Sequence, residues 1–244
     1  MYYDESKWKD CGDYYIYEDD QRNIGWKQVK IGRPSGSILS NCIGNNKGNY
    51  NIPTQQETAE YIAGIKEKIF TKEQQDRMDY GTKNEEYARK WYTQQNECIV
   101  KEMGFAIPKF DLRIGVSLDG LVLNLDETET DGIIEIKCPQ KMYKPLKLRK
   151  EGRLPHTEEY DHIWRSHYDQ MQMGMAVFNK KWCDYIVFCI PENNVYIERV
   201  FFNQYYWNKV MKLLDDFIIT YLNPALEIRN KQHISVKYPL MPPS

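Results

Sequence analysis

Two carboxylates and a lysine that could support hydrolysis of a phosphodiester lie within residues 115–139, GVSLDGLVLNLDETETDGIIEIKCP. They are Asp119, Glu135 and Lys137. Protein-bound Mg²⁺ is typically held by one or two carboxylates, with waters and substrate phosphate completing its ligands. A lysine beside such an ion can position the attacking water and offset charge on the phosphorus. We therefore expect Asp119 and Glu135 to bind Mg²⁺, with Mn²⁺ as a substitute and the carbonyl of Ile136 as a further ligand, and Lys137 to serve catalysis.

The elements that must position these residues read as a β-hairpin. Residues 116–125 and 133–138 are rich in Val, Ile and Leu, and the polar ETETDG between them is typical of a turn. Because side chains alternate along a strand, Glu135 and Lys137 share one face, and Asp119 is expected to face them from the first strand. The same short pattern also fits an exposed hairpin whose charged residues only face solvent.

Three further segments carry a resemblance to a known family. Their sequences are Trp26…Lys30-Ile31-Gly32…Ser35-Gly36-Ser37, Gly81-Thr82-Lys83-Asn84-Glu85-Glu86-Tyr87-Ala88-Arg89 and Tyr168-Asp169-Gln170-Met171-Gln172. Together with Ser117-x-Asp119-Gly120 and Glu135-Ile136-Lys137-Cys138-Pro139, they resemble, in order, the motifs of the lambda-exonuclease or YqaJ-type viral recombinase group of PD-(D/E)xK nucleases. The resemblance covers about residues 26–172.

The resemblance implies a fold, an activity and partners. The expected fold is α/β, with a restriction-endonuclease-like core in which helices flank a central mixed β-sheet. The expected activity is exonucleolytic hydrolysis of double-stranded DNA from a free end, 5′ to 3′. The remaining single strand would serve an annealing partner in viral or phage recombination or repair, and members of the family can form ring-shaped homotrimers.

The resemblance also implies roles for residues outside the hairpin. Glu85 becomes a third acidic member of the metal site, although a surface ion pair with Arg89 is the ordinary alternative. Lys30 and Ser37 take the positions that contact the terminal 5′ phosphate. Lys30 replaces an arginine of the family and therefore lacks the bidentate fork.

Four more residues complete the expected DNA and phosphate contacts. Ser35 is a second phosphate candidate, although either serine of this turn could simply cap a short helix. Ser117 belongs to the hairpin motif, and Gln170 takes the position of an active-site glutamine. Lys141 opens a run at 141–153 with six basic residues and one acid, which fits either a DNA-facing surface or a solvated loop.

Composition bounds the class of protein. The 244 residues are 41% hydrophobic with a net charge of −2, which suits one nuclease domain over 1–244 with an acidic extension at 1–25 and a proline-containing tail at 223–244. The first residues resemble no signal peptide and no long apolar run occurs, so we expect an intracellular protein without membrane contact. The six cysteines are scattered and are expected to be free thiols.

Periodicity predicts the other elements. Helices are expected at 54–70, capped by Thr54, from 71 to a break at 80–82, at 83–95, at 156–179 and at 203–222. Strands are expected at 98–107, 183–190 and 194–202. Residues 1–25 are expected to be irregular or to form short strand pairs.

Three further functions are compatible with the same residues. A structure- or sequence-specific endonuclease would share the acids and the lysine, because such a motif fixes chemistry and not substrate. In a non-catalytic DNA-binding module, the acidic residues would take no part in chemistry. An RNA-directed nuclease would use the same site on a different nucleic acid.

Overall fold

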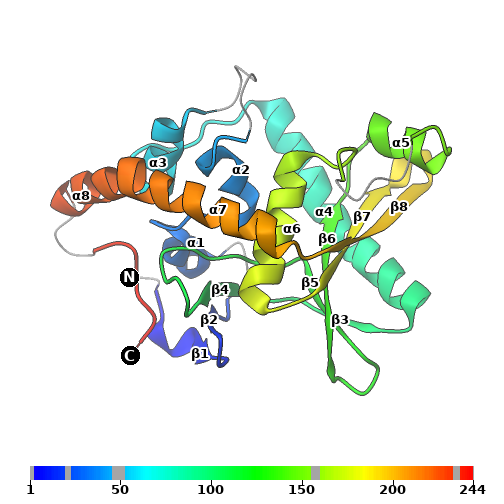
Figure 1. Cartoon of the computed structure of the whole chain (residues 1–244), viewed down its shortest axis with the longest axis horizontal. Helices are drawn as coiled ribbons and strands as arrows, with labels where there is room; N and C mark the ends of the chain where they lie inside the picture. Colours follow the sequence, from blue (N-terminus) through cyan, green and yellow to red (C-terminus); the bar gives the residue numbers. More distant parts are fainter. Residues whose placement is uncertain (1–2, 20–22, 46–52, 155–159, 233–236, 244) are drawn as a thin grey trace.

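A central mixed sheet carries the hairpin that the sequence predicts. The computed structural model describes residues 3–19, 23–45, 53–154, 160–232 and 237–243. The sheet has the order β3-β5-β6-β7-β8 (Figure 1). Its strands are β3 (Ile99–Lys101), β5 (Gly120–Leu123), β6 (Glu129–Lys137), β7 (Trp182–Cys189) and β8 (Asn194–Phe201).

Strand pairing confirms the hairpin and the mixed character of the sheet, but the predicted turn is wrong: β6 begins at Glu129, inside the segment ETETDG, and the turn lies at 124–128. β5 and β6 pair antiparallel, with Gly120 opposite Ile134, and β7 and β8 form a second antiparallel hairpin. β6 and β7 run parallel from Gly132 to Lys137. The first strand of the hairpin is shorter than predicted, so Asp119 lies directly before β5 rather than within it.

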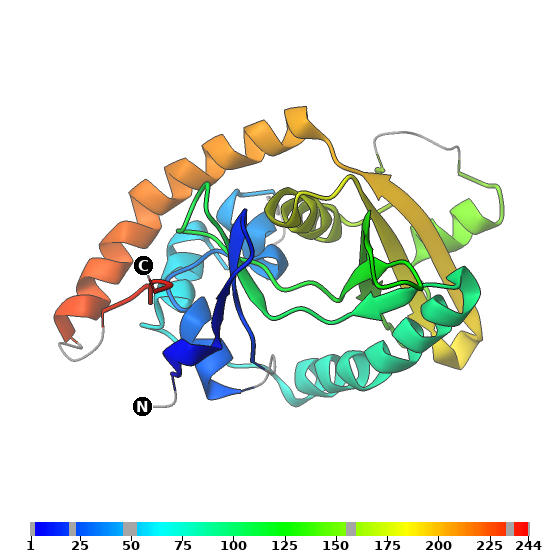
Figure 2. The same ribbon diagram turned by 90° about the horizontal axis from the view of Figure 1, so that it is seen from below.

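Helices cover both faces of this sheet (Figure 2). On one face, Ala88 and Tyr92 of α4 (Lys72–Asn96) share a buried cluster with Ile134 and Ile136 of β6. On the other face, α6 (Arg165–Phe178) packs an apolar stripe of Tyr168, Met171, Met175 and Phe178 into the main core. Because β6 alternates, Ile134 and Ile136 face α4, while Glu135 and Lys137 lie on the α6 side.

The predicted strand at 98–107 is wrong in its continuity. The chain forms β3 and, after a break, β4 (Phe105–Pro108), which joins a separate sheet of order β1-β2-β4. The other strands of that sheet are β1 (Trp8–Asp10) and β2 (Tyr14–Tyr17), which confirms strand pairing in the N-terminal segment. The break occurs at Gly104, where a Cβ would lie 2.1 Å from the Tyr17 carbonyl oxygen. Only glycine allows so close an approach of two chains.

Two helix boundaries differ from the prediction. Thr54 caps α3 (Gln55–Ala63) through a capping box, but the helix ends at Gly64, whose φ of +71° is the left-handed conformation typical of a helix C-terminus. It does not continue to residue 70. Conversely, α4 runs unbroken through Gly81, because an interior glycine costs only about 1 kcal/mol and a long capped helix absorbs it.

The remaining predicted elements shift in similar ways. The basic run contains the helix α5 (Lys144–Lys150), so it is not a loop throughout. The helix predicted at 156–179 begins at Arg165, with residues 160–164 irregular and residues 155–159 outside the described part of the chain. The other helical segments are η1 (Glu5–Lys7), α1 (Ile24–Lys30), η2 (Gly36–Ile38), α2 (Leu39–Cys42), η3 (Ile190–Glu192), α7 (Gln204–Phe217), the π-helical η4 (Ile218–Leu222) and α8 (Asn223–Gln232).

The C-terminal segment is more ordered than the predicted tail. α7 passes through the π-helical turn directly into α8, whose second residue is Pro224. The chain then returns to the body, since Leu240 accepts a hydrogen bond from the buried Arg33 guanidinium at 2.6 Å.

Two further observations concern the apolar character of the helices and the state of the cysteines. Within the described residues, none of the helices combines the length and the apolar character that crossing a bilayer requires. All six cysteines are free, as expected, and only Cys11 is exposed.

Candidate active site

The end of the β5–β6 hairpin brings the three predicted hairpin residues together. Asp119 Oδ2 accepts a hydrogen bond from the backbone N–H of Ile136 at 2.7 Å. Lys137 Nζ donates to Glu135 Oε1 at 2.5 Å. The alternation along β6 and the position of Asp119 just before β5 therefore place two carboxylates and one ammonium side by side.

Burial and charge set the titration of this group. Glu135 is only 4% exposed, and burial together with the nearby Asp119 carboxylate raises its pKa to about 8, although Lys137 opposes the rise. Burial alone lowers the pKa of Lys137, but the Glu135 and Asp119 carboxylates outweigh it and raise that pKa above its ordinary value. Lys137 is therefore an ammonium at neutral pH. Its single positive charge does not fully offset the negative charge of the neighbouring carboxylates, because the pKa of Glu135 stays raised.

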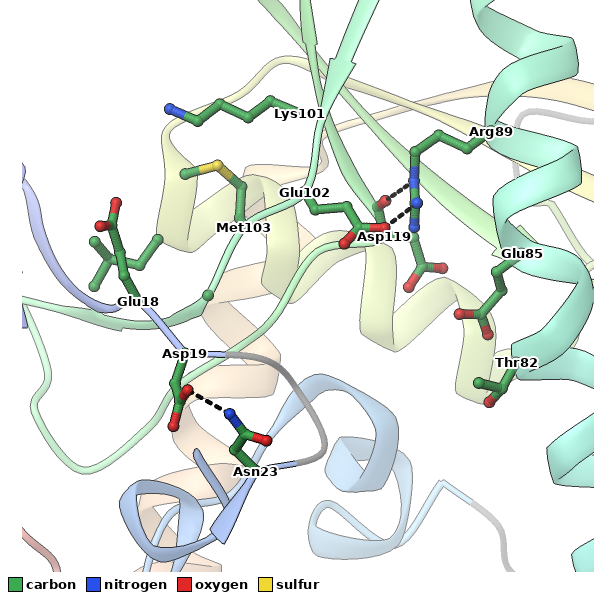
Figure 3. Close-up of a pocket in the computed structure, with 12 residues that line it drawn as sticks. Glu18, Asp19, Asn23, Thr82, Glu85, Arg89, Lys101, Glu102, Met103 and Asp119 are labelled. Carbon is green, nitrogen blue, oxygen red and sulfur yellow. Dashed lines mark hydrogen bonds and ion pairs between the residues drawn. The ribbon is translucent and has the colours of Figure 1, made fainter. Parts of the chain in front are cut away.

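A cavity of about 810 Å³ opens beside Asp119 (Figure 3). Glu85 and Thr82 of α4 line it together with Asp119, and Glu18 and Asp19 form another wall. The cavity is thus rich in carboxylate oxygens. Glu85 also contributes to the raised pKa of Glu135, so the two carboxylates act on one another.

Arg89 contacts the loop that carries Asp119. Its Nε donates to the backbone carbonyl of Asp119 at 3.1 Å, and its guanidinium forms an ion pair with Glu102 (Figure 3). Arg89 therefore fixes the backbone of Asp119 from the neighbouring helix.

The donor set fits a hard divalent cation. Glu135 is buried beside Asp119, Glu85 acts on it from α4, and the Lys137 ammonium supplies the opposing positive charge. Oxygen donors and excess negative charge are what Mg²⁺ requires, and one or two carboxylates suffice for it. Among the described residues, no three His, Cys, Asp or Glu side chains converge closely enough to form a metal cluster. The carboxylates of Asp119 and Glu135 are therefore the candidate ligands of such a cation, and Glu85 lines the same cavity as Asp119.

Gln170 and Gln172 of α6 differ in their surroundings. Gln170 Oε1 accepts from Lys137 Nζ at 3.4 Å, which places this predicted residue at the site. Gln172 is fully buried, donates to the Phe201 carbonyl and accepts from the Asn203 N–H, so it does not face the cavity beside Asp119. Its amide clamps the junction of β8 and α7.

A second cavity, of about 330 Å³, contains the predicted phosphate residues Lys30, Ser35 and Ser37. Basic side chains that the motif did not mark also line it, Lys27, Lys66 and Lys68 among them. No acidic side chain from the described part of the chain lines this cavity. We call it the basic cavity, and its charge suits a phosphate.

Lys30 is the central cation of the basic cavity. Its ammonium lies 4.1 Å from the centre of the Trp26 ring, and burial together with the Lys68 charge lowers its pKa to about 8. Trp26 Nε1 in turn donates to Ser117 Oγ at 3.3 Å, two residues before Asp119. The basic cavity is therefore tied to the loop that carries the predicted catalytic carboxylate.

The serines of the basic cavity do not act as side-chain caps. Ser35 occupies the N-cap position of η2 but makes no capping hydrogen bond. Ser37 lies inside η2. A simple helix-capping role is thus not supported for Ser35. Lys141 is exposed and lines neither cavity.

Several residues around the site carry no recognisable signal in the sequence. Glu18 and Asp19 come from a segment to which no chemistry was assigned, and Lys68 comes from the loop after α3. His167 on α6 likewise belongs to no motif; burial, followed by the Lys137 charge, lowers its pKa to about 3.

The arrangement of the whole chain is similar to that of known exonucleases. The structure is similar to an alkaline exonuclease, LHK-Exo, from Laribacter hongkongensis, with a TM-score of 0.64, 19% identity and coverage of 88% of this chain and 100% of that one. The same exonuclease in complex with dAMP matches at a TM-score of 0.63 and 20% identity over the same shares of the two chains. A phage-related exonuclease from Haemophilus somnus 129PT matches at a TM-score of 0.55 and 13% identity, covering 80% of this chain and 96% of that one.

These likenesses confirm the restriction-endonuclease-like fold. No curated protein sequence matches the chain significantly. The family model described as a YqaJ-like viral recombinase domain matches residues 25–181, which is more than half of the 244 residues. The chain therefore belongs to the YqaJ-like viral recombinase family.

Proposed function

We propose that this protein is an exonuclease that hydrolyses double-stranded DNA from a free end, 5′ to 3′, and depends on a divalent cation, Mg²⁺ by preference. The observation that carries the proposal is the grouping of Asp119, Glu135 and Lys137 beside an oxygen-lined cavity, in a chain of the recombinase family. The structural neighbours with this fold are named exonucleases.

The cation would be held by Asp119 and Glu135, with the Ile136 carbonyl and Glu85 as supporting oxygens. When bound, Mg²⁺ supplies positive charge and Lewis acidity toward the scissile phosphate. Glu135 accepts a hydrogen bond from Lys137 and so holds its ammonium in place. Lys137 donates to the attacking water or to a phosphate oxygen and offsets the negative charge that develops on the phosphorus.

Gln170 and Arg89 orient this group. The Gln170 amide oxygen lies 3.4 Å from Lys137 Nζ and restrains the ammonium from α6. Arg89 holds the Asp119 carbonyl from α4. Positioning of this kind contributes to the rate because a misplacement of about 1 Å can cost about 100-fold.

The basic cavity would bind the phosphate at the end of the degraded strand. Lys30 supplies charge, and the hydroxyls of Ser35 and Ser37 line the same space. Ser117 links it to the catalytic loop through Trp26. A terminal phosphate held there would place the first phosphodiester near Asp119, which favours release of mononucleotides.

The test compares a linear duplex with a covalently closed circle of the same sequence, each with Mg²⁺ and with EDTA. We expect release of mononucleotides from the linear form only, and only with Mg²⁺. End labels on either strand terminus establish the direction, since a 5′ label is released first under this proposal. Efficient cutting of the closed circle would instead support an endonuclease, and hydrolysis of an RNA duplex an RNA-directed enzyme.

We extend the proposal to recombination because the chain belongs to a viral recombinase family. The single strand that remains would pass to a single-strand annealing protein, and a homotrimer would encircle the duplex. Light scattering of the purified protein measures its oligomeric state, and a monomer would contradict the ring.

A further inference from the structure

An exposed tryptophan lies beside the proposed catalytic lysine and has no role in the proposed hydrolysis. Trp164, the residue before α6, is 51% exposed. One side of its indole stacks on Tyr143, with ring centroids 4.4 Å apart and an angle of 27° between the planes. A large aromatic ring that is packed on one face and half exposed leaves surface for a planar partner.

The tryptophan rests on a fixed aromatic base. His167, one turn along α6, contacts both rings, with centroids 5.3 Å from Trp164 and 5.9 Å from Tyr143. His167 Nδ1 is hydrogen-bonded to the hydroxyl of Tyr185 on β7 at 2.7 Å. The stack is therefore anchored to the central sheet, and Trp164 is held in place before any ligand arrives. We call Trp164, Tyr143 and His167 the aromatic platform.

The aromatic platform adjoins the catalytic group. His167 is bonded to the Tyr185 hydroxyl, and Tyr185 pairs with Glu135 across β6 and β7, so the platform is linked directly to the strand that carries Lys137. Gln170, which contacts Lys137, follows His167 by three residues on the same helix. A phosphate at Lys137 would thus lie beside the helix that carries Trp164 and His167.

The segments that carry Tyr143 and the serines of the basic cavity lie on opposite sides of α6. In both Figure 1 and Figure 2, α6 stands between α2, which follows the serines of the basic cavity, and α5, which follows Tyr143. A strand whose terminal phosphate occupies the basic cavity and whose scissile phosphate lies at Lys137 continues toward the platform. The helix α5, which follows Tyr143, carries lysines at 144, 147 and 150.

We propose that Trp164 is a stacking site for a nucleobase of the strand being degraded, on the side of the scissile phosphate away from the terminal phosphate. The inference rests on the proposed exonuclease function. An aromatic face accepts every base, so the site is expected to be tolerant of sequence. The stacked base keeps the strand in register while each mononucleotide leaves.

The experiment measures binding of a labelled single-stranded oligonucleotide by fluorescence anisotropy, with Ca²⁺ in place of Mg²⁺ because Ca²⁺ also takes oxygen ligands. The variants are Trp164→Ala, Trp164→Phe and the matched control Tyr205→Ala, which removes an aromatic side chain that is 70% exposed on α7. A second oligonucleotide series carries one abasic position, moved along from the 5′ end.

We expect Trp164→Ala to weaken binding by about 5-fold or more, in the range of base–aromatic stacking, with Trp164→Phe close to wild type. The wild type should lose affinity at one abasic position near the 5′ end, and Trp164→Ala should be insensitive to that position. Tyr205→Ala should bind as wild type does.

Equal binding by wild type and Trp164→Ala would overturn the inference. So would an abasic penalty that persists unchanged in Trp164→Ala, because the ring would then act on something other than a base. A changed oligomeric state of Trp164→Ala with unchanged DNA binding would assign the ring to a protein contact and also overturn it. Absence of hydrolysis by the wild type on linear duplex would instead defeat the exonuclease proposal itself.

Discussion

The basic cavity predicts an unusual pH dependence for recognition of a DNA end. Burial, followed by the charge of Lys68, lowers the pKa of Lys30 to about 8. Lys30 is then positively charged below that pH and neutral above it. A terminal phosphate is already a dianion above about pH 7, because its second pKa is about 6. A change between about pH 7 and 9 in the preference for a 5′-phosphate end over a 5′-hydroxyl end is therefore expected to follow the charge of Lys30.

The magnitude follows from this pKa. For a pKa of about 8, roughly 90% of Lys30 is charged at about pH 7 and roughly 10% at about pH 9. If only the ammonium binds the phosphate, the preference for a 5′-phosphate end over a 5′-hydroxyl end falls about ninefold over this interval. Lys30→Arg should abolish the fall, because a guanidinium stays charged throughout.

The assay compares rates of mononucleotide release from two duplexes that differ only in the 5′ phosphate. Their ratio cancels pH effects on the chemical step that both substrates share. Lys68→Ala should move the fall to higher pH, since it removes a like charge that disfavours the Lys30 ammonium. Lys66→Ala is the matched control, because Lys66 lines the same cavity but is ion-paired with Glu60 at 2.6 Å.

Two results would refute this assignment of the pH dependence to Lys30. One is a wild-type ratio that stays flat from about pH 7 to 9. The other is a Lys30→Arg ratio that falls as steeply as that of the wild type, since the fall would then belong to another group.

Three further predictions concern α6 and α4. Gln172→Ala should lower the free energy of unfolding by about 2–4 kcal/mol in urea titrations, because two buried backbone groups lose their partner, while exposed Gln204→Ala should have little effect. Burial is the main cause that lowers the pKa of His167 to about 3, so the folded protein holds this side chain neutral. The free energy of unfolding should therefore fall by up to about 4 kcal/mol as the pH drops from about 6.5 toward 3. His167→Gln should flatten this dependence, and equal acid profiles of the two proteins would contradict the prediction. Glu85→Gln should weaken Mn²⁺ binding, measured by calorimetry, by about 10-fold or more, whereas Glu86→Gln, which alters an exposed ion pair with Lys90, should not.

Local rules were enough to predict that Glu135 and Lys137 lie together on one face of a strand. Glu135 and Lys137 share a face because strand side chains alternate, and that alternation needs no knowledge of the rest of the chain. The capping box at Thr54 likewise marked a helix start. These features depend on residues within a few positions of each other.

Boundaries that depend on distant partners were missed. The chain leaves the main sheet at Gly104 because the Tyr17 carbonyl lies against it, and no pattern near residue 104 reports that contact. The C-terminal helix continues past Pro224 because a π-helical turn precedes it. The hydrophobic periodicity of the sequence contains no information on the contact with Tyr17 or on the π-helical turn.

The walls of the two cavities were missed for the same reason. Glu18 joins the oxygen-lined cavity through the pairing of β2 with β4, and Lys68 reaches the basic cavity from the loop after α3. Both residues lie in segments without a recognisable motif. Only the tertiary arrangement gives them a place at the site.

The most direct test of the central claim is the rate at which Lys137→Ala releases mononucleotides from a linear duplex in Mg²⁺. Lys181→Ala is the matched control, because Lys181 is an exposed lysine beside the opposite end of β6, paired with Asp131 at 2.7 Å. We expect Lys137→Ala to lose about 100-fold or more of the rate with its thermal unfolding near that of the wild type, and Lys181→Ala to retain the full rate. A folded Lys137→Ala protein that degrades DNA as fast as the wild type would contradict the assignment of the active site.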